Sequence, residues 1–76
     1  MSPKLPRVTS DDVLHASGRD GWRIVRQRGG HAQLKHPTKP GRVTVSRHAG
    51  EMVRLRTLDH ILEQVGLSVE EFIALL

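Results

Sequence analysis

The sequence predicts an α+β fold in which helices cover one face of a three-stranded antiparallel sheet. Residues that alternate between apolar and polar, as in half-buried strands, lie in the middle of the chain, whereas helix signals lie at both ends. The turns between the alternating stretches are short, so neighbouring strands are expected to pair antiparallel. Such a sheet can keep one face in solvent while helices cover the other, which predicts a two-layer sandwich.

A chain of 76 residues has room for one small domain, which we expect to span residues 1–76, with residues 1–8 as a flexible N-terminal arm. It contains no cysteine, which excludes disulfides and thiolate chemistry and fits a reducing compartment. No apolar run approaches the roughly 20 residues of a membrane span, and the first ten residues lack the apolar core of a signal peptide. We therefore expect a soluble, cytoplasmic protein with no membrane partner.

A first helix is predicted to start after Thr9. Thr9 and Asp12 have the spacing of a capping box, in which each side chain accepts a hydrogen bond from the other residue's backbone N–H. Val8 and Val13 stand at the two positions of a hydrophobic staple. Gly21 is expected to end this helix, because glycine readily takes the left-handed conformation found after the last helical residue.

A β-hairpin is predicted to follow. Residues 22–27, "WRIVRQ", alternate in polarity and predict a strand, and residues 28–30 are interpreted as a three-residue hairpin loop. Residues directly opposite each other in an antiparallel pair share a face. The predicted register therefore pairs Gln27 with His31, Val25 with Gln33, and Arg23 with Lys35. The other, apolar face is predicted to carry Trp22, Ile24, Ala32 and Leu34.

The third strand and the last two helices complete the predicted order. Residues 37–41, "PTKPG", predict a turn, and residues 42–47, "RVTVSR", predict a strand whose valines face the core. A second helix is indicated by apolar residues at helical spacing, with Thr57 as the expected N-cap and Gly66 at its end. These apolar residues are Leu58, Ile61, Leu62 and Val65. A second capping box, Ser68 with Glu71, predicts a short last helix.

Positive charge is concentrated in the middle of the chain. Residues 19–56 hold ten Lys and Arg against two acids, whereas residues 57–76 hold four acids and no Lys or Arg. The net charge of the whole chain is +4. A surface that only keeps a protein in solution usually mixes both signs, so this one-sided segment indicates a partner rich in phosphate.

Several other classes of site are disfavoured by the residue pattern. Five histidines suggest a metal, but His31 and His36 point to opposite faces of a strand, and no pair has the i, i+4 spacing of a helical zinc clamp. The two acids of the basic segment, Asp20 and Glu51, are too far apart in sequence to predict a carboxylate pair for hydrolysis. The glycines before His31 do not lead from a strand into a helix, as a nucleotide-binding loop does. We therefore expect no metal and no cofactor.

His31 is the residue best placed to carry chemistry. RNA supplies its own nucleophile, the 2′-hydroxyl, so its cleavage needs a base, positive charge near the phosphate and in-line positioning, and no metal. Histidine suits the role of base because its ordinary pKa lies near neutrality. Arg23, Gln33 and Lys35 would share the face of His31, and Arg28 would border it at the turn. On these residues alone, an exposed strand histidine without a catalytic role remains an open alternative.

Three segments follow one another in a specific order and spacing: "DGWRIVRQRGGHAQLKHP", then "RVTVSRH", then "TLDHILEQVGLSVEEF". Together they resemble the HicA (YcfA-like) toxins of bacterial toxin–antitoxin pairs, and the resemblance runs from about Thr9 to Phe72. The tripeptide of residues 29–31, Gly-Gly-His, stands where this family has Gly-Ser-His. The range from Thr9 to Phe72 covers nearly the whole chain.

The resemblance implies a double-stranded-RNA-binding-like αβββα fold, here with a short extra C-terminal helix. It also implies a translation-blocking mRNA endoribonuclease, a type II toxin that a HicB-type antitoxin neutralises by covering the active face. The family's catalytic histidine corresponds to His31. The residues then expected to bind RNA are Arg23, Gln27, Arg28, Gln33 and Lys35.

Two other interpretations of the basic segment remain open at this point. A non-catalytic double-stranded-RNA-binding module would read the shape of the duplex through 2′-hydroxyl and phosphate contacts, and would need the cations but not the imidazole of His31. A basic protein-interaction subunit would need no RNA at all. His48, at the end of the third predicted strand, is a possible general acid in the catalytic interpretation.

Overall fold

Three helices and three strands follow one another as the sequence predicts. The structure, a computed structural model, describes residues 4–76. In chain order the elements are α1 (Ser10–Asp20), β1 (Arg23–Arg28), β2 (His31–Lys35), β3 (Val43–Ser46), α2 (Leu55–Val65) and α3 (Val69–Leu75).

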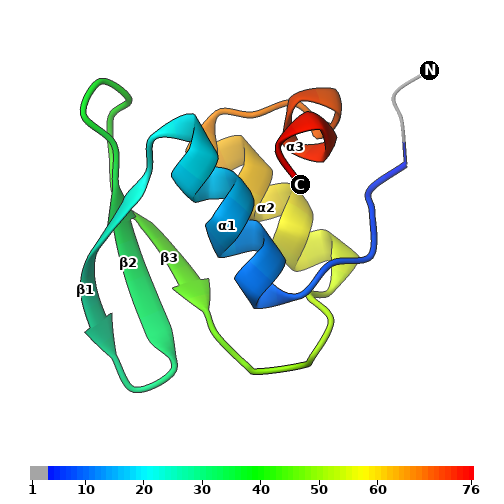
Figure 1. The fold of residues 1–76 in the computed structure, drawn as a ribbon, viewed down its shortest axis with the longest axis horizontal. Coiled ribbons are helices and arrows are strands. Elements are labelled where there is room, and N and C mark those ends of the chain that lie inside the picture. The colour runs from blue at the N-terminus through cyan, green and yellow to red at the C-terminus, as the bar shows by residue number, and fades with distance from the viewer. Residues whose placement is uncertain (1–3) are drawn as a thin grey trace.

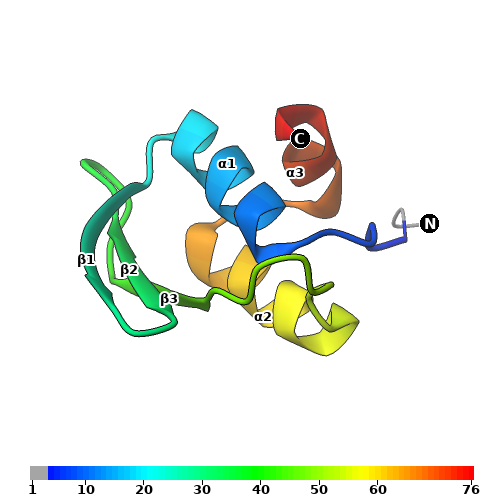
Figure 2. The same cartoon turned by 60° about the horizontal axis from the view of Figure 1, so that its bottom comes forward.

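The elements form two layers. The strands make one antiparallel sheet in the order β1-β2-β3. The helices gather on one side of this sheet, with α1 and α2 next to β3 and with β1 farthest from them (Figure 1). Figure 2 shows the same separation from a second direction, with α3 packed against α1. The predicted α+β sandwich with an extra C-terminal helix is confirmed.

Helix α1 has the ends that the sequence predicts. The hydroxyl of Thr9 accepts a hydrogen bond from the backbone N–H of Asp12 (3.1 Å), and the Asp12 carboxylate accepts one from the N–H of Thr9 (2.9 Å). The second of these bonds lowers the pKa of Asp12, because it favours the charged carboxylate. Both staple residues, Val8 and Val13, are buried. Gly21 ends the helix in the left-handed region, with φ of 112°.

Helix α2 begins earlier than predicted, and Thr57 is not its N-cap. Arg54 holds the N-cap position with an extended backbone and makes no side-chain capping bond. The backbone N–H of Val53 donates to the Val8 carbonyl (2.8 Å), so a tertiary contact directs the chain just before the helix starts. Gly66 ends the helix at φ 71°, as predicted.

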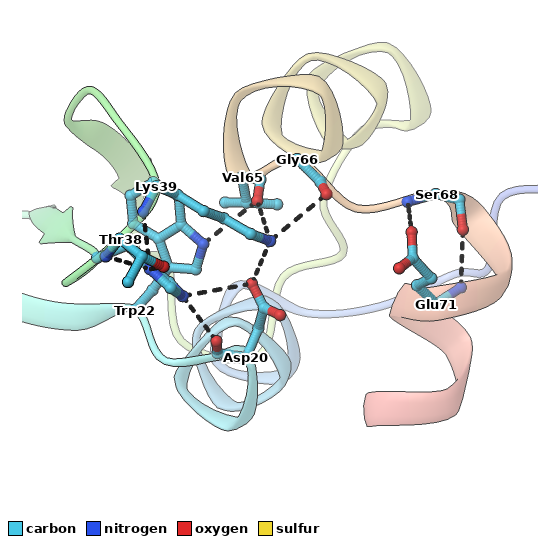
Figure 3. Close-up of polar contacts among 9 residues, drawn as sticks. Asp20, Trp22, Thr38, Lys39, Val65, Gly66, Ser68 and Glu71 are labelled. Atoms are coloured by element: carbon cyan, nitrogen blue, oxygen red, sulfur yellow. Dashed lines mark hydrogen bonds and ion pairs between the residues drawn. The ribbon is translucent and has the colours of Figure 1, made fainter.

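Helix α3 closes the core from the C-terminal end. Ser68 and Glu71 form the predicted capping box, with reciprocal bonds of 2.9 and 3.0 Å that Figure 3 shows. The backbone N–H of Ser68 lowers the pKa of Glu71 by stabilising its carboxylate. The cap positions Phe72, which is fully buried, against the rest of the core.

The core lies between the helices and the β2–β3 half of the sheet. Its buried apolar residues are Val8, Val13, Ala16, Trp22, Ala32, Leu34, Val43, Val45, Leu58, Ile61, Leu62, Val65, Leu67 and Phe72. Of the predicted N-terminal arm, residues 1–3 lie outside the described residues, and Leu5 packs against the core. No helix within residues 4–76 is long and apolar enough to span a membrane.

The predicted hairpin register is wrong at the tip. The loop contains two residues, Gly29 and Gly30, so that Arg28 pairs with His31. Gly29 has φ of 58° and Gly30 does not lie in the left-handed region, as in a type II′ turn, whose twist suits a two-residue hairpin. The sequence offers glycines at both loop positions, and composition alone does not distinguish a two-residue from a three-residue loop.

A bulge in β1 restores the predicted pairing farther from the tip. Ile24 pairs with Leu34 and Arg26 pairs with Gln33, which leaves Val25 as the extra residue. Arg23 therefore still faces Lys35, as predicted. The predicted apolar face of β1 is only partly correct, because Ile24 is 47% exposed where the helices do not reach this edge strand.

Candidate functional site

The candidate site is the sheet face that points away from the helices. Along β2, exposed or half-buried His31, Gln33 and Lys35 alternate with buried Ala32 and Leu34, so the first three share the outer face. Their partners on β1 are Arg28, Arg26 and Arg23, respectively. We call the set of these residues and Arg42 the basic face; its members are Arg23, Arg26, Arg28, His31, Gln33, Lys35 and Arg42.

The corrected register changes which side chains lie beside His31. Gln27 pairs with buried Ala32 and so belongs to the helix-facing side of the sheet, not to the side predicted for it. Arg26, which the sequence reasoning did not select, lies opposite Gln33 on the basic face. Arg26 could have been selected only if the bulge in β1 had been predicted, and no residue type in β1 indicates a bulge.

His31 lies between two strands at the hairpin end of the basic face. Arg28 is its partner on β1 and Ser46 is its partner on β3. Thr44 pairs with Gln33 in the next row, and the Arg42 guanidinium donates a hydrogen bond to the Gln33 side-chain oxygen (3.1 Å). The strands therefore bring an imidazole, a hydroxyl and a guanidinium together across three neighbouring strands.

No carboxylate neutralises the basic face from within the sheet, because β1, β2 and β3 contain no Asp or Glu. Lys39 and Arg47, which belong to the same basic segment, instead pair with Asp20 (2.6 Å) and Asp11 (2.8 Å). Within residues 4–76, none of the ion pairs involves a cation of the basic face. These cations are exposed to solvent and free to meet an anionic partner.

His36 has a structural role, in contrast to His31. Its Nδ1 accepts hydrogen bonds from the backbone N–H groups of Thr38 and Lys39 (both 3.1 Å), so Nε2 carries the proton and donates to the Asp20 carbonyl (2.8 Å). Its ring lies edge-on to buried Trp22, with centroids 5.3 Å apart. Both nitrogens and the packing of the ring against Trp22 therefore help to hold the turn after β2 to the end of α1.

Lys39 ties the same turn to the end of α2. Its ammonium donates to the Asp20 carboxylate (2.6 Å) and to the carbonyl of Val65 (3.0 Å), as Figure 3 shows. The indole N–H of Trp22 donates to the same carbonyl (3.3 Å). A cation near the C-terminus of a helix also interacts favourably with the helix dipole. This cluster holds the sheet against the helices and leaves the basic face open.

A pocket of about 300 Å³ lies beyond Ser46, where β3 meets the starts of α1 and α2. The loop after β3 forms much of its wall, and the backbone N–H of His48 donates to the hydroxyl of Ser10 (3.2 Å) there. The lining residues are Ser10, Ser46, His48, Glu51, Met52, Val53, Arg54 and Thr57. Sequence reasoning missed this pocket because its walls come from three separate parts of the chain.

The remaining titratable side chains do not assemble into a metal site. Within the part of the chain that the structure describes, no group of three or more His, Asp or Glu residues is close enough to hold a metal ion. His15 and His60 lie exposed on α1 and α2, on the helical layer rather than on the basic face. Of the five histidines, His31 is the one that the strand register brings among the arginines of β1.

Comparison with known protein families identifies the chain. No curated protein matches it. One family model does match, that of the HicA toxin of bacterial toxin–antitoxin systems, and the match covers residues 10–67 of the 76. This range includes the whole sheet, α1 and α2, and hence every residue of the basic face. The chain belongs to the HicA toxin family and is the toxin of a toxin–antitoxin system.

Proposed function

We propose that this toxin is an mRNA endoribonuclease that blocks translation by a metal-independent reaction, with His31 as its acid or base. One observation carries the proposal. The register sets His31 between Arg28 and Ser46 on a sheet face that has cations and no carboxylate. This is the arrangement expected of a group that exchanges protons beside a bound phosphodiester.

The proposed reaction is an attack of the RNA on its own backbone. His31 removes the proton of a 2′-hydroxyl, and the 2′-oxygen forms a bond to the adjacent phosphorus. The bond from phosphorus to the 5′-oxygen of the next nucleotide breaks, and that oxygen takes up a proton. The products are a 2′,3′-cyclic phosphate and a free 5′-hydroxyl. The candidate for the second proton transfer is His48, which lies in the loop after β3, two residues beyond the cross-strand partner of His31, Ser46.

The cations supply the electrostatic part of the reaction. Arg28 stands opposite His31 and is placed to stabilise the negative charge that develops on the phosphate. Arg23 and Lys35, two rows farther along the sheet, bind the flanking phosphates. Gln33, held by the guanidinium of Arg42, orients the backbone or a base. The role predicted for Gln27 stays a prediction, and its place on the helix-facing side favours Arg26 instead.

We expect the antitoxin to bind the basic face as well. A HicB-type antitoxin that neutralises this toxin would cover the basic face and present acidic side chains to it. Complementary charge speeds such an encounter and suppresses wrong partners. Val25, the bulged residue of the edge strand β1, is 52% exposed and adds apolar area that a protein partner can bury.

One experiment tests the proposed activity. The purified protein is incubated with mixed RNA in the presence of a chelator, and wild type is compared with His31→Ala and His60→Ala. The last variant removes an exposed histidine from α2 and serves as the matched control. We expect His31→Ala to lower the cleavage rate by about 10²- to 10⁴-fold, as loss of a general acid or base does, while His60→Ala cleaves normally.

The same three proteins, with RNA binding measured beside cleavage, separate the ribonuclease from the non-catalytic alternatives. Binding of RNA without cleavage by any of the three proteins would favour the non-catalytic double-stranded-RNA-binding module. Equal cleavage by wild type and His31→Ala would remove His31 from the mechanism. RNA affinity that does not change with salt would exclude both RNA functions, because phosphate contacts release counterions.

A further inference from the structure

The pocket beyond Ser46 lies at the same end of the molecule as His31. In Figure 1 the β1–β2 hairpin, the end of β3 and the start of α1 lie along the lower side of the molecule, where the loop after β3 runs to the start of α2. Ser46 links the two sites, because it is the cross-strand partner of His31 and also lines the pocket. Neighbouring strands are about 4.8 Å apart, so a chain bound at His31 reaches the pocket by crossing one strand.

The walls of the pocket are fixed by backbone contacts. The loop after β3 turns sharply at Gly50, which has φ of 77°, and the N–H of Glu51 donates to the His48 carbonyl (3.1 Å). Met52 pairs as a β-bridge with Thr9, next to the bond between Val53 and Val8. A loop that is tied down at both places holds a preformed pocket, as small-ligand sites usually are.

The lining combines an apolar surface with a few polar groups of both signs. Met52 is a large apolar residue that lines the pocket and is 58% exposed, so it can contact a ligand there. Glu51 can only accept hydrogen bonds through its carboxylate when ionised, whereas Arg54 can only donate. At about 300 Å³ the pocket lies at the small end of the range of ligand sites.

We propose that this pocket binds the nucleobase next to the scissile phosphate, and that it selects bases with an amino group over uracil. The proposal rests on the proposed ribonuclease function. A base fits this lining because its flat faces are apolar, and can lie against Met52, while its edge carries hydrogen-bonding groups. The Glu51 carboxylate accepts from the amino group of guanine, adenine or cytosine. Uracil has no amino group, and its one edge donor, the N3–H, lies between two carbonyl oxygens that repel the carboxylate.

The position of Arg54 and His48 supports a nucleotide over an isolated base. Both line the pocket that Ser46, the cross-strand partner of His31, also lines; His48 follows Ser46 by two residues, and Arg54 is the N-cap residue of α2. A guanidinium there can hold the phosphate that joins the bound base to the scissile bond. The pocket thus sets which base stands beside the cleaved bond, while the basic face binds the backbone without regard to sequence.

The test is a map of the cleavage sites in an RNA of random sequence. Wild type is compared with Glu51→Gln and Met52→Ala, and the matched controls on α3 are Glu70→Gln and Ile73→Ala, each exposed and outside the pocket. We expect wild type to disfavour uracil at one position beside the cut by about tenfold or more, the value of one good base contact. Glu51→Gln should abolish this preference, because an amide also donates to uracil, and the controls should keep it.

A second measurement does not depend on cleavage. Guanosine and uridine 5′-monophosphates are titrated into the isotope-labelled wild-type protein, and the amide signals of residues 46–57 are followed. We expect larger shifts with the guanosine nucleotide, and their loss in Met52→Ala. The same base profile in all five proteins, or no shift with either nucleotide, would overturn the proposal. If wild type cleaves no RNA, the ribonuclease function fails, and selective shifts would still support base binding in the pocket.

Discussion

The salt dependence of RNA binding gives a quantitative test of the basic face. The face carries five permanent cations, which are Arg23, Arg26, Arg28, Lys35 and Arg42. Each phosphate contact to a single-stranded nucleic acid contributes about −0.7 to the slope of log affinity against log salt concentration. If all five cations bind phosphate, the slope is about −3.5, and affinity falls roughly 130-fold between 50 and 200 mM salt.

Arg26→Gln is the informative perturbation, because only the bulged register places Arg26 on this face. We expect a slope of about −2.8 and a fall in affinity of roughly 50-fold over the same salt range. Gln27 is uncharged and cannot change the slope, but Gln27→Ala should also leave the affinity itself unchanged, since Gln27 pairs with buried Ala32 on the other side of the sheet. Arg56→Gln, on α2, removes the same charge away from β1 and is the control for net charge.

The assay is the fluorescence anisotropy of a labelled single-stranded RNA, titrated at several salt concentrations. All variants are made in the His31→Ala background so that the RNA stays intact. A slope for Arg26→Gln that equals the slope for Arg56→Gln would refute the assignment of Arg26 to the proposed RNA-binding surface. A larger loss of RNA affinity in Gln27→Ala than in Arg26→Gln at any one salt concentration would favour the unbulged register that the sequence predicts.

Three further predictions concern stability. Ser17→Ala should raise the free energy of unfolding by about 1 kcal/mol, measured by urea denaturation, because the Ser17 hydroxyl is buried and has no hydrogen-bond partner within residues 4–76; an unchanged midpoint would show that the hydroxyl is satisfied in solution. Gly21→Ala should lower the free energy of unfolding by about 2 kcal/mol, because Gly21 has φ of 112° and a Cβ there would lie 2.7 Å from Nε2 of His36. Gly18→Ala, in the last turn of α1 where a Cβ would meet nothing within 4 Å, should instead raise the thermal midpoint. Asp12→Asn should reduce the loss of stability in acid, because the pKa of Asp12 is lower in the folded than in the unfolded chain. The stability that the Asp12 carboxylate contributes is complete above about pH 5 and is lost as pH falls through the folded pKa. Equal acid unfolding of wild type and Asp12→Asn would contradict this prediction.

The parts of the fold that depend on local signals could be predicted from the sequence. Thr9 and Ser68 cap α1 and α3 as expected, because a capping box is completed within four residues. Trp22 and Phe72 are buried as their spacing indicates. The start of α2 was not predictable in this way, because a contact between Val53 and Val8 sets it, and these residues are far apart in sequence.

The candidate site was predictable in outline but not in register. Alternation in β2 places His31 and Lys35 on one face, whichever residues lie opposite. The partners on β1 depend on loop length and on the bulge at Val25, and a change of one residue exchanges Gln27 for Arg28 beside His31. The pocket around Met52 forms where three separate segments of the chain come into contact, and the hydrophobic periodicity of a sequence does not predict such contacts.

The bulge in β1 also affects how the molecule behaves in the presence of its own copies. β1 is an edge strand, and all six of its residues are exposed. A long, regular and exposed edge offers unpaired backbone groups to any other strand, and this is a common route to aggregation. Here an irregular residue at Val25 interrupts the edge, and arginines on both sides of it repel a second copy. The same feature that brings Arg26 beside Gln33 therefore also disfavours edge-to-edge pairing between two copies of this chain.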